Sequence, residues 1–342
     1  MASVEPPVLF SVAPDYYRFA VAELRHALDV TKVQRVGPDA GVVSLGAGGI
    51  ADVADACLGG ELPLIRHLAQ ADAVRGAGGF ERPDDLAEWA VSVLLASLET
   101  GDTISLHTWD SGEAPFAPGK VRRPLLELLL DNGIRVVTSD ASRVGSVCLG
   151  AERVVAGVNS TDVSLVDWAG GRIRLATRPE QVSRAEFKLE ELFGFVGEPV
   201  GSTAVDLGAS PGGWTRILAD RGFTTIHAVD PAELDQRVLD LPGVEHHKQT
   251  AGDFVKDWEG EPVDLIVNDM RMVPQLTAHT MVEAARLLRP GGQAVITLKL
   301  GTNNPVKQID DALEMLGASY DPSFMRQLQH NRHEVTLVAT RR

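Results

Sequence analysis

A glycine-rich turn is the sharpest chemical feature of the sequence. Residues 205–215 read Val-Asp-Leu-Gly-Ala-Ser-Pro-Gly-Gly-Trp-Thr. Glycines in such a turn let the backbone approach a ligand closely, and a helix that follows offers free N–H groups. A dinucleotide-binding turn would carry G-x-G-x-x-G, whereas this turn has G-x-x-x-G-G with an acid, Asp206, two places before the first glycine. The pattern favours a ligand with a positive amino group, such as the methionine part of S-adenosylmethionine, although a purely structural turn is the alternative.

Two further acids could hold the rest of an adenosine-containing ligand. Asp230 ends the next strand-like segment, about 20 residues after Gly208, where a carboxylate can accept hydrogen bonds from both ribose hydroxyls. Asp253 lies further along the chain, after a strand-like segment that follows Asp230, and could accept a hydrogen bond from an adenine amino group. A solvated loop carboxylate is the alternative for Asp253.

Two apolar segments end in charged residues. Residues 263–268 lead into Asp269, and residues 294–298 lead into Lys299. A lone lysine there could be a surface group with a buried stem. Buried strand ends rarely tolerate unpaired charge, however, and the carboxyl ends of parallel strands meet at one edge of a sheet. We therefore expect Asp269 and Lys299 to form a paired site that faces a ligand crevice.

The second half of the chain supplies the elements that must position these residues. Beyond residues 169–179, strand-like and helix-like segments alternate strictly, which predicts an α/β fold with a parallel sheet and crossover helices. We expect strands at 203–207, 225–229, 263–268, 294–299 and 335–339, and helices at 214–221, 275–288 and 306–316.

The first half reads as α+β. A short apolar run at 7–12 precedes helical spacing of apolar residues at 16–28. Later the pattern predicts a helix at 86–98, a strand at 103–108 and a helix at 124–130. These stretches predict two small subdomains, with a boundary near residue 75.

Composition indicates a globular protein with more than one domain. The chain has 342 residues, of which 44% are hydrophobic and 23% are charged. Its longest nearly apolar run, at 90–98, is too short to cross a membrane, and the N-terminus lacks a basic stretch followed by an apolar one. We expect a cytoplasmic protein without a membrane partner.

Charge and cysteine content narrow the classes of partner. The net charge is −15, so any polyanion must be met by a local basic patch. Cys57 and Cys148 lie far apart without metal-ligand spacing, which argues against a disulfide framework and a zinc site. We expect both to be buried free thiols.

Five segments together resemble a known family. In chain order they are Ser-Arg-Ala-Glu-Phe-Lys-Leu at 183–189, the glycine-rich turn, Asn-Asp-Met at 268–270, Leu-Lys-Leu at 298–300 and Glu-Val-Thr at 334–336. They resemble the motifs of the FtsJ-like ribose 2′-O-methyltransferases over residues 183–342, just under half of the chain. In that family a Lys-Asp-Lys-Glu tetrad carries the reaction, and the matching positions are Lys188, Asp269, Lys299 and Glu334.

The resemblance implies a domain order and a cofactor. Residues 327–336 and the link from 155 to 188 are similar to the branch that methylates a cytidine of bacterial large-subunit (23S) ribosomal RNA. That branch implies a ferredoxin-like α+β subdomain at 1–75, a THUMP-like RNA-binding subdomain at 76–170 and a Rossmann-like methyltransferase domain at 171–342. The implied cofactor is S-adenosylmethionine, and the residues expected to bind it are Ser183, Asp206, Gly208, Ser210, Pro211, Gly212, Gly213, Trp214, Asp230, Asp253 and Asp269.

The RNA partner would have to meet local basic groups. One cluster lies at 172–188 and another at 120–123. A solvated linker is the alternative for each cluster. The expected RNA-binding residues are Lys120, Arg122, Arg123, Arg172, Arg174, Arg178 and Arg184.

The expected reaction is an in-line transfer of a methyl group to a ribose 2′-oxygen. A neutral lysine could remove the hydroxyl proton, and we assign Lys299 as that base. Lys188 would be the neighbouring cation, while Asp269 and Glu334 would orient the two amines. We expect no metal and a monomeric enzyme with ribosomal RNA as its partner.

Two other classes of function remain open. The chain could methylate a small molecule or a protein, with the N-terminal half as an oligomerisation or substrate domain. It could also be an RNA-binding or assembly protein that keeps the methyltransferase fold without turnover, although the presence of all four tetrad residue types counts against this. A nicotinamide dehydrogenase is least favoured, because the glycine spacing does not fit.

Overall fold

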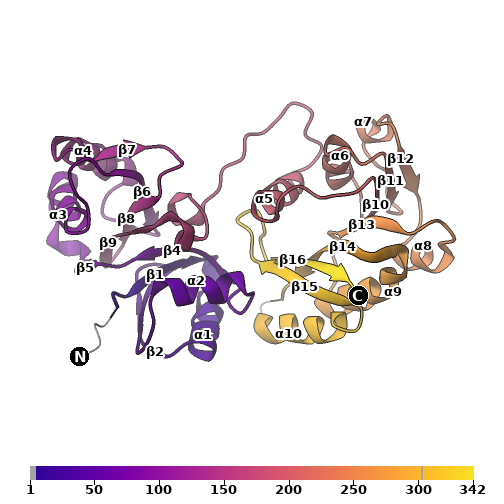
Figure 1. Ribbon diagram of the computed structural model, residues 1–342, viewed down its shortest axis with the longest axis horizontal. Helices are drawn as coiled ribbons and strands as arrows, with labels where there is room; N and C mark the ends of the chain where they lie inside the picture. Colours follow the sequence, from indigo (N-terminus) through magenta and orange to yellow (C-terminus); the bar gives the residue numbers. More distant parts are fainter. Residues whose placement is uncertain (1–4, 302) are drawn as a thin grey trace. The chain divides into compact units, whose positions relative to one another are not determined.

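The computed structural model describes residues 5–301 and 303–342. The chain divides into two compact units, Met1–Ile173 and Arg174–Arg342 (Figure 1). The first four residues of the subdomain expected at 1–75 lie outside the described residues.

The first unit begins with a βαββαβ segment. Its four strands form an antiparallel sheet in the order β2-β3-β1-β4, and β1 lies between β3 and β4. The elements are β1 (Val8–Val12), α1 (Tyr17–Ala27), β2 (Val30–Arg35), β3 (Ala40–Leu45), α2 (Ile50–Leu58) and β4 (Ile65–Gln70).

A second, five-stranded sheet completes the first unit in the order β5-β9-β8-β6-β7. Its helices α3 and α4 share an apolar core with the sheet, which includes Leu94, Leu125 and Val147. The elements are β5 (Ala73–Gly76), α3 (Pro83–Leu95), β6 (Thr103–Ser111), α4 (Pro118–Asp131), β7 (Arg135–Val137), β8 (Arg143–Gly150) and β9 (Arg153–Ser160).

Helix α4 differs from the prediction at its start. The expected helix began at Pro124, but α4 begins at Pro118 and contains Pro124 in its interior. The buried residues Val121, Leu125 and Leu129 recur every four positions and therefore extend the apolar face one turn further back. A proline does begin this helix, but it is Pro118 and not Pro124.

The second unit holds a seven-stranded sheet in the order β12-β11-β10-β13-β14-β16-β15 (Figure 1). The five strands from β12 to β14 are parallel, and β10 lies between β11 and β13. The elements are α5 (Glu186–Val196), β10 (Thr203–Leu207), α6 (Gly213–Asp220), β11 (Thr225–Val229), α7 (Gln236–Leu239), β12 (Val244–His247), α8 (Ala251–Asp257), β13 (Val263–Asn268), α9 (Pro274–Ala284), β14 (Leu288–Lys299), α10 (Pro305–Leu316), β15 (Tyr320–Arg326) and β16 (Glu334–Arg341).

The prediction of a wholly parallel sheet is wrong at one side. Strand β16 is antiparallel to both β14 and β15. A helix crossover lets the next strand run in the same direction as the one before it. The connection at 327–333 is too short for a crossover, so β15 and β16 form an antiparallel hairpin. The α/β alternation is confirmed up to β14, and the sheet as a whole is mixed.

Two further observations concern the cysteines and the lengths of the helices. Cys57 and Cys148 are both buried and free, as expected. No helix among the described residues is long and apolar enough to cross a membrane.

Candidate active site

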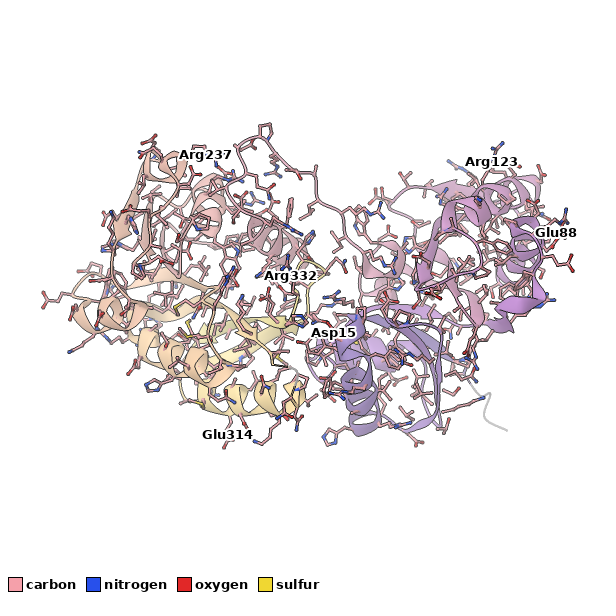
Figure 2. All side chains as sticks on the ribbon, turned by 180° about the vertical axis from the view of Figure 1, so that it is seen from behind. Asp15, Glu88, Arg123, Arg237, Glu314 and Arg332 are labelled. Atoms are coloured by element: carbon pink, nitrogen blue, oxygen red, sulfur yellow. The ribbon has the colours of Figure 1, made fainter. Side chains whose placement is uncertain are left out.

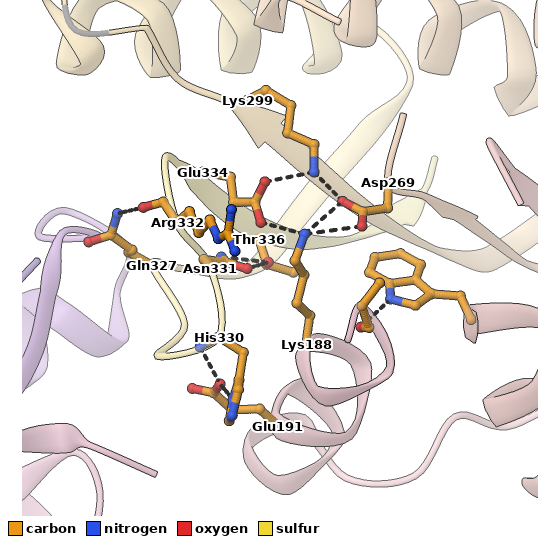
Figure 3. Close-up of polar contacts among 12 residues, drawn as sticks. Lys188, Glu191, Asp269, Lys299, Gln327, His330, Asn331, Arg332, Glu334 and Thr336 are labelled. Carbon is orange, nitrogen blue, oxygen red and sulfur yellow. Dashed lines mark hydrogen bonds and ion pairs between the residues drawn. The ribbon is translucent and has the colours of Figure 1, made fainter. Parts of the chain in front are cut away.

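Four side chains form a closed ring of alternating charge (Figure 3). Lys188 Nζ lies 3.1 Å from Asp269 Oδ2 and is paired with Glu334 Oε1. Lys299 Nζ lies 2.7 Å from Glu334 Oε2 and is paired with Asp269 Oδ1. The side chains are between 8% and 19% exposed, so each lysine is held between two carboxylates and largely shielded from water. The four residues of the expected tetrad therefore meet in one place.

Helix α5 carries Lys188 into this ring. Its residues Leu189 and Leu192 are fully buried against α6, in a core that includes Trp214. The Trp214 indole also donates a hydrogen bond of 2.8 Å to the carbonyl of Ala185, just before α5 begins. The start of α5 is thereby fixed against the helix that follows the glycine-rich turn.

Strand ends carry Asp269 and Lys299. Asp269 directly follows β13, and Lys299 is the last residue of the neighbouring parallel strand β14. The turn after β13 is braced by Asn268, whose side-chain oxygen accepts a hydrogen bond of 2.9 Å from the backbone N–H of Met270. The two strand ends bring the Asp269 carboxylate and the Lys299 amine into contact.

Glu334 enters the ring from the antiparallel strand. It opens β16 and lies directly opposite Lys299 in the β14–β16 register. The preceding loop is held by Glu191 of α5, whose carboxylate accepts hydrogen bonds from the backbone N–H groups of Gln329 and His330, at 2.7 and 2.9 Å. It also lies 2.6 Å from His330 Nδ1 (Figure 3). Glu191 thus anchors the loop that leads into β16.

The two carboxylates of the ring affect the protonation of the groups around them. Burial alone would lower the pKa of Lys188, but Asp269 and Glu334 outweigh it and raise that pKa overall. Burial opposes ionisation of Glu334, yet Lys299 and Lys188 together lower its pKa. Lys188 therefore stays protonated and Glu334 stays ionised near neutral pH.

The glycine-rich turn lies between β10 and α6, as predicted. Gly208 has a φ of +80° and Gly212 a φ of +109°, a region that glycine occupies without strain. A side chain at Gly212 would meet Val238 of α7 at 2.8 Å. Glycine is therefore required at position 212 by its own backbone conformation and by the contact with α7, and not only by the space that a ligand would need.

Asp206, at the end of β10, is buried beneath this turn. It is 1% exposed and accepts a hydrogen bond of 2.7 Å from the Thr215 hydroxyl. Burial raises the pKa of Asp206 to about 7, and the negative charges of Asp269 and Asp230 add to this effect. Its carboxylate would gain from a nearby positive group.

The other expected cofactor residues have different surroundings. Asp230 accepts backbone hydrogen bonds from Ser210 at 3.1 Å and Ala232 at 2.8 Å, so its carboxylate is tied to the glycine-rich turn. The Ser183 hydroxyl is buried without a hydrogen-bond partner among the described residues. Asp253 lies in the first turn of α8, where its backbone N–H and carboxylate bond to Thr250, so it has a helix-capping role.

The basic residues expected to bind RNA differ in their exposure and in their ion pairs. Lys120 and Arg123 are exposed on α4, and Arg123 points outward from that helix (Figure 2). Arg174 and Arg184 are also exposed, whereas Arg122 is partly buried and Arg178 pairs with Glu190 at 2.9 Å.

Arg172 has a structural environment. It pairs with Asp39 at 3.1 Å and with Asp110 at 2.9 Å, and it donates to the Asp110 carbonyl at 2.6 Å. These bonds join the β2–β3 turn to β6 within the first unit. Most of the hydrogen-bonding capacity of this side chain is already used by the protein.

The structure adds positioning residues that the sequence analysis missed. Glu186 is 2% exposed, accepts hydrogen bonds from the N–H groups of Val182 and Ser183, and pairs with Arg216. It holds Ser183 beside the glycine-rich turn, as Glu191 holds the loop before Glu334. The available signal was the acids two residues before and three residues after Lys188 in a largely apolar helix, since a buried acid is costly unless it is paired.

Comparisons with known proteins show the family to which the chain belongs. Residues 181–316 match the model of the family described as FtsJ-like methyltransferase. A protein of Laribacter hongkongensis named ribosomal RNA large subunit methyltransferase M is 32% identical over 277 residues, which cover 75% of this chain and 74% of the relative. The protein of that name from Shewanella frigidimarina is 30% identical over 301 residues, 80% of this chain and 82% of the relative.

A third relative aligns more locally. The ribosomal RNA large subunit methyltransferase M of Halorhodospira halophila is 36% identical over 179 residues, so the matched part is 51% of each chain. Family membership therefore rests on the two longer alignments and on the FtsJ-like segment that contains Lys188, Asp269 and Lys299. The chain belongs to the FtsJ-like methyltransferases, in the family of ribosomal RNA large subunit methyltransferase M.

Proposed function

We propose that the chain transfers a methyl group from S-adenosylmethionine to the ribose 2′-oxygen of a cytidine in large-subunit (23S) ribosomal RNA, with Lys299 as the general base. The observation that carries this proposal is the ring of Lys188, Asp269, Lys299 and Glu334, next to a glycine-rich turn. A ring with two lysines and two shared carboxylates can accept a proton at one amine while the other amine keeps both carboxylates paired.

The residues around the turn fit S-adenosylmethionine. The buried Asp206, whose pKa is raised to about 7, would gain from the positive amino group of the methionine part. Asp230 lies at the end of β11 with its carboxylate fixed by backbone N–H groups, which suits a ribose diol. The buried Ser183 hydroxyl lacks a partner among the described residues and could serve the ligand. When bound, S-adenosylmethionine supplies an activated methyl group.

The proposal gives the two lysines different roles in proton transfer. The pKa of Lys188 is raised, so Lys188 keeps its proton and remains the cation that holds Asp269 and Glu334. Lys299 is the amine left to take the proton of the 2′-hydroxyl. The deprotonated oxygen would then accept the methyl group that bound S-adenosylmethionine would supply, with the electron pair of the carbon–sulfur bond left on sulfur.

The first unit is proposed as the RNA-binding part. The βαββαβ segment with strand order β2-β3-β1-β4 supports a ferredoxin-like subdomain, and the five-stranded sheet supports a THUMP-like subdomain after it. Exposed Lys120 and Arg123 are the strongest candidates for phosphate contacts in this unit. Arg172 is the weakest, because it already pairs with Asp39 and Asp110.

The experiment compares Lys299→Arg with Lys299→Met in a single-turnover assay on ribosomal RNA that lacks the modification. Arginine keeps the positive charge but cannot become neutral near pH 7. We expect both variants to bind S-adenosylmethionine in calorimetry and to lose methyl transfer. Near-wild-type transfer by Lys299→Arg would refute the base assignment. Transfer to a small molecule or protein but not to RNA would refute the substrate, and turnover of neither would favour an assembly protein.

A further inference from the structure

A second cluster of ligating side chains lies outside the site described above, near one edge of the same sheet. His227 Nδ1 and His247 Nε2 are 3.1 Å apart. Glu245 Oε2 lies 3.2 Å from the first nitrogen and 3.9 Å from the second. Two imidazole nitrogens and one carboxylate oxygen therefore converge at one point.

Strand register brings these residues together. β11 and β12 are parallel, and His227 lies directly opposite Glu245, while His247 is two residues further along β12. Side chains two positions apart on a strand share a face, and directly paired residues share it too. The Glu-x-His pattern on the edge strand is thus placed beside His227 by the backbone alone.

The triangle of atoms has the dimensions of a metal site. A point in the plane of the three atoms and equidistant from them lies about 2.0 Å from each, which is the distance of zinc–nitrogen and zinc–oxygen bonds. Ligands of this type suit zinc and similar transition metals rather than magnesium or calcium, which prefer oxygen.

Neighbouring aromatic rings hold the two imidazoles in place. The His247 ring lies 4.9 Å from Phe254, and the His227 ring lies 4.9 Å from Trp258, both measured between centroids. The Glu245 side chain is 59% exposed, so the cluster is open to water on that side.

We propose that His227, Glu245 and His247 bind one Zn²⁺ ion, with water completing its coordination, and that the ion fastens edge strand β12 to β11. Asp230 directly follows β11, and its backbone N–H donates to the carbonyl of His247 at 3.2 Å. Metal binding would therefore stiffen the strand ends beside Asp230. The proposal concerns structure rather than the methyl-transfer step, and it stands independently of the function proposed above.

The test uses the full chain, freed of any affinity tag and treated with EDTA. Titration with ZnCl₂ in a calorimeter should show one strong site, Co²⁺ should give the visible absorption of a nitrogen-ligated ion, and Mg²⁺ should not compete. We expect His247→Ala and His227→Gln to weaken Zn²⁺ binding by about 100-fold or more, since even loss of an outer-shell partner costs 10- to 100-fold. Glu245→Gln, at an exposed position, should weaken binding without disturbing the fold.

His279→Ala is the matched control. His279 pairs with Glu283 at 3.5 Å on α9, outside the cluster. This variant should bind Zn²⁺ like the unaltered chain and show the same rise in melting temperature on addition of the metal. Absence of a strong site in the unaltered chain, or equal affinity of all four variants, would overturn the proposal. A rise in melting temperature that persists in Glu245→Gln and His247→Ala would also overturn it.

Discussion

Glu191 links helix α5 to the loop that precedes Glu334, and its replacement by glutamine tests how that loop is held. The carboxylate is 2% exposed and accepts two backbone hydrogen bonds and one from the His330 ring. Glutamine keeps the size but has one acceptor oxygen and no charge. Whichever oxygen is replaced, at least one half-buried donor loses its partner.

The magnitude follows from these bonds. A hydrogen bond to a charged group contributes about 1.5–3 kcal/mol and a neutral one about 0.5–1.5 kcal/mol. Loss of one charged bond and weakening of another destabilise the closed loop by about 3 kcal/mol. Since 1.36 kcal/mol corresponds to a factor of ten, opening of the loop should become about 10²-fold more frequent.

Hydrogen exchange followed by mass spectrometry measures this opening directly. Peptides that cover residues 327–333 should exchange about 10²-fold faster in Glu191→Gln, while peptides from β10 and β11 should not change. Methyl transfer should fall because Glu334 follows this loop, whereas S-adenosylmethionine binding should persist. Glu314→Gln on the exposed face of α10 is the control (Figure 2). Unchanged exchange at 327–333 would refute the view that Glu191 holds the loop.

Three further predictions concern the turn, the buried acid and the RNA surface. Asp206→Asn should raise the melting temperature at pH 8 and weaken S-adenosylmethionine binding. The folded-state pKa of about 7 exceeds the unfolded value, so the unaltered protein loses stability as the pH rises from about 4 to 7. If the variant's gain in melting temperature were as large at pH 4 as at pH 8, this explanation would be contradicted. Gly212→Ala should destabilise the protein by about 1–3 kcal/mol in denaturant unfolding, because of its positive φ and the contact with Val238; an unchanged midpoint would exclude this strain. Replacing both Lys120 and Arg123 by alanine should weaken RNA binding and reduce its salt dependence, and an unaltered salt slope would remove α4 from the RNA surface.

The central strands could be predicted because the local sequence is enough to indicate each of them. Residues 203–207, 225–229 and 263–268 are apolar runs bounded by turn residues, and β10, β11 and β13 have these bounds. The strand ends then bring Asp269 and Lys299 together, since parallel strands end at one edge. These parts of the site required no knowledge of distant contacts.

The remaining parts depend on contacts between distant segments. β15 escaped prediction because Pro322 interrupts its alternation, and its pairing with β16 shifts register between Pro322 and Phe324. Glu191 looked like an ordinary helix carboxylate, because its partners lie in a loop far along the chain. The proximity of His227 to His247 likewise requires the β11–β12 register, which spacing in the sequence does not provide.

The placement of β16 has a consequence for how the enzyme acquires activity during folding. β16 is hydrogen-bonded on both sides, to β14 and β15, and begins with Glu334. Five parallel strands and the glycine-rich turn can assemble from residues that precede it in the chain. The second carboxylate arrives only when the last strand inserts, and until then both lysines share Asp269 alone. The ring that we propose as the catalytic centre therefore closes only when this long-range strand pairing forms, and we expect a partly folded molecule that lacks β16 in the sheet to be inactive.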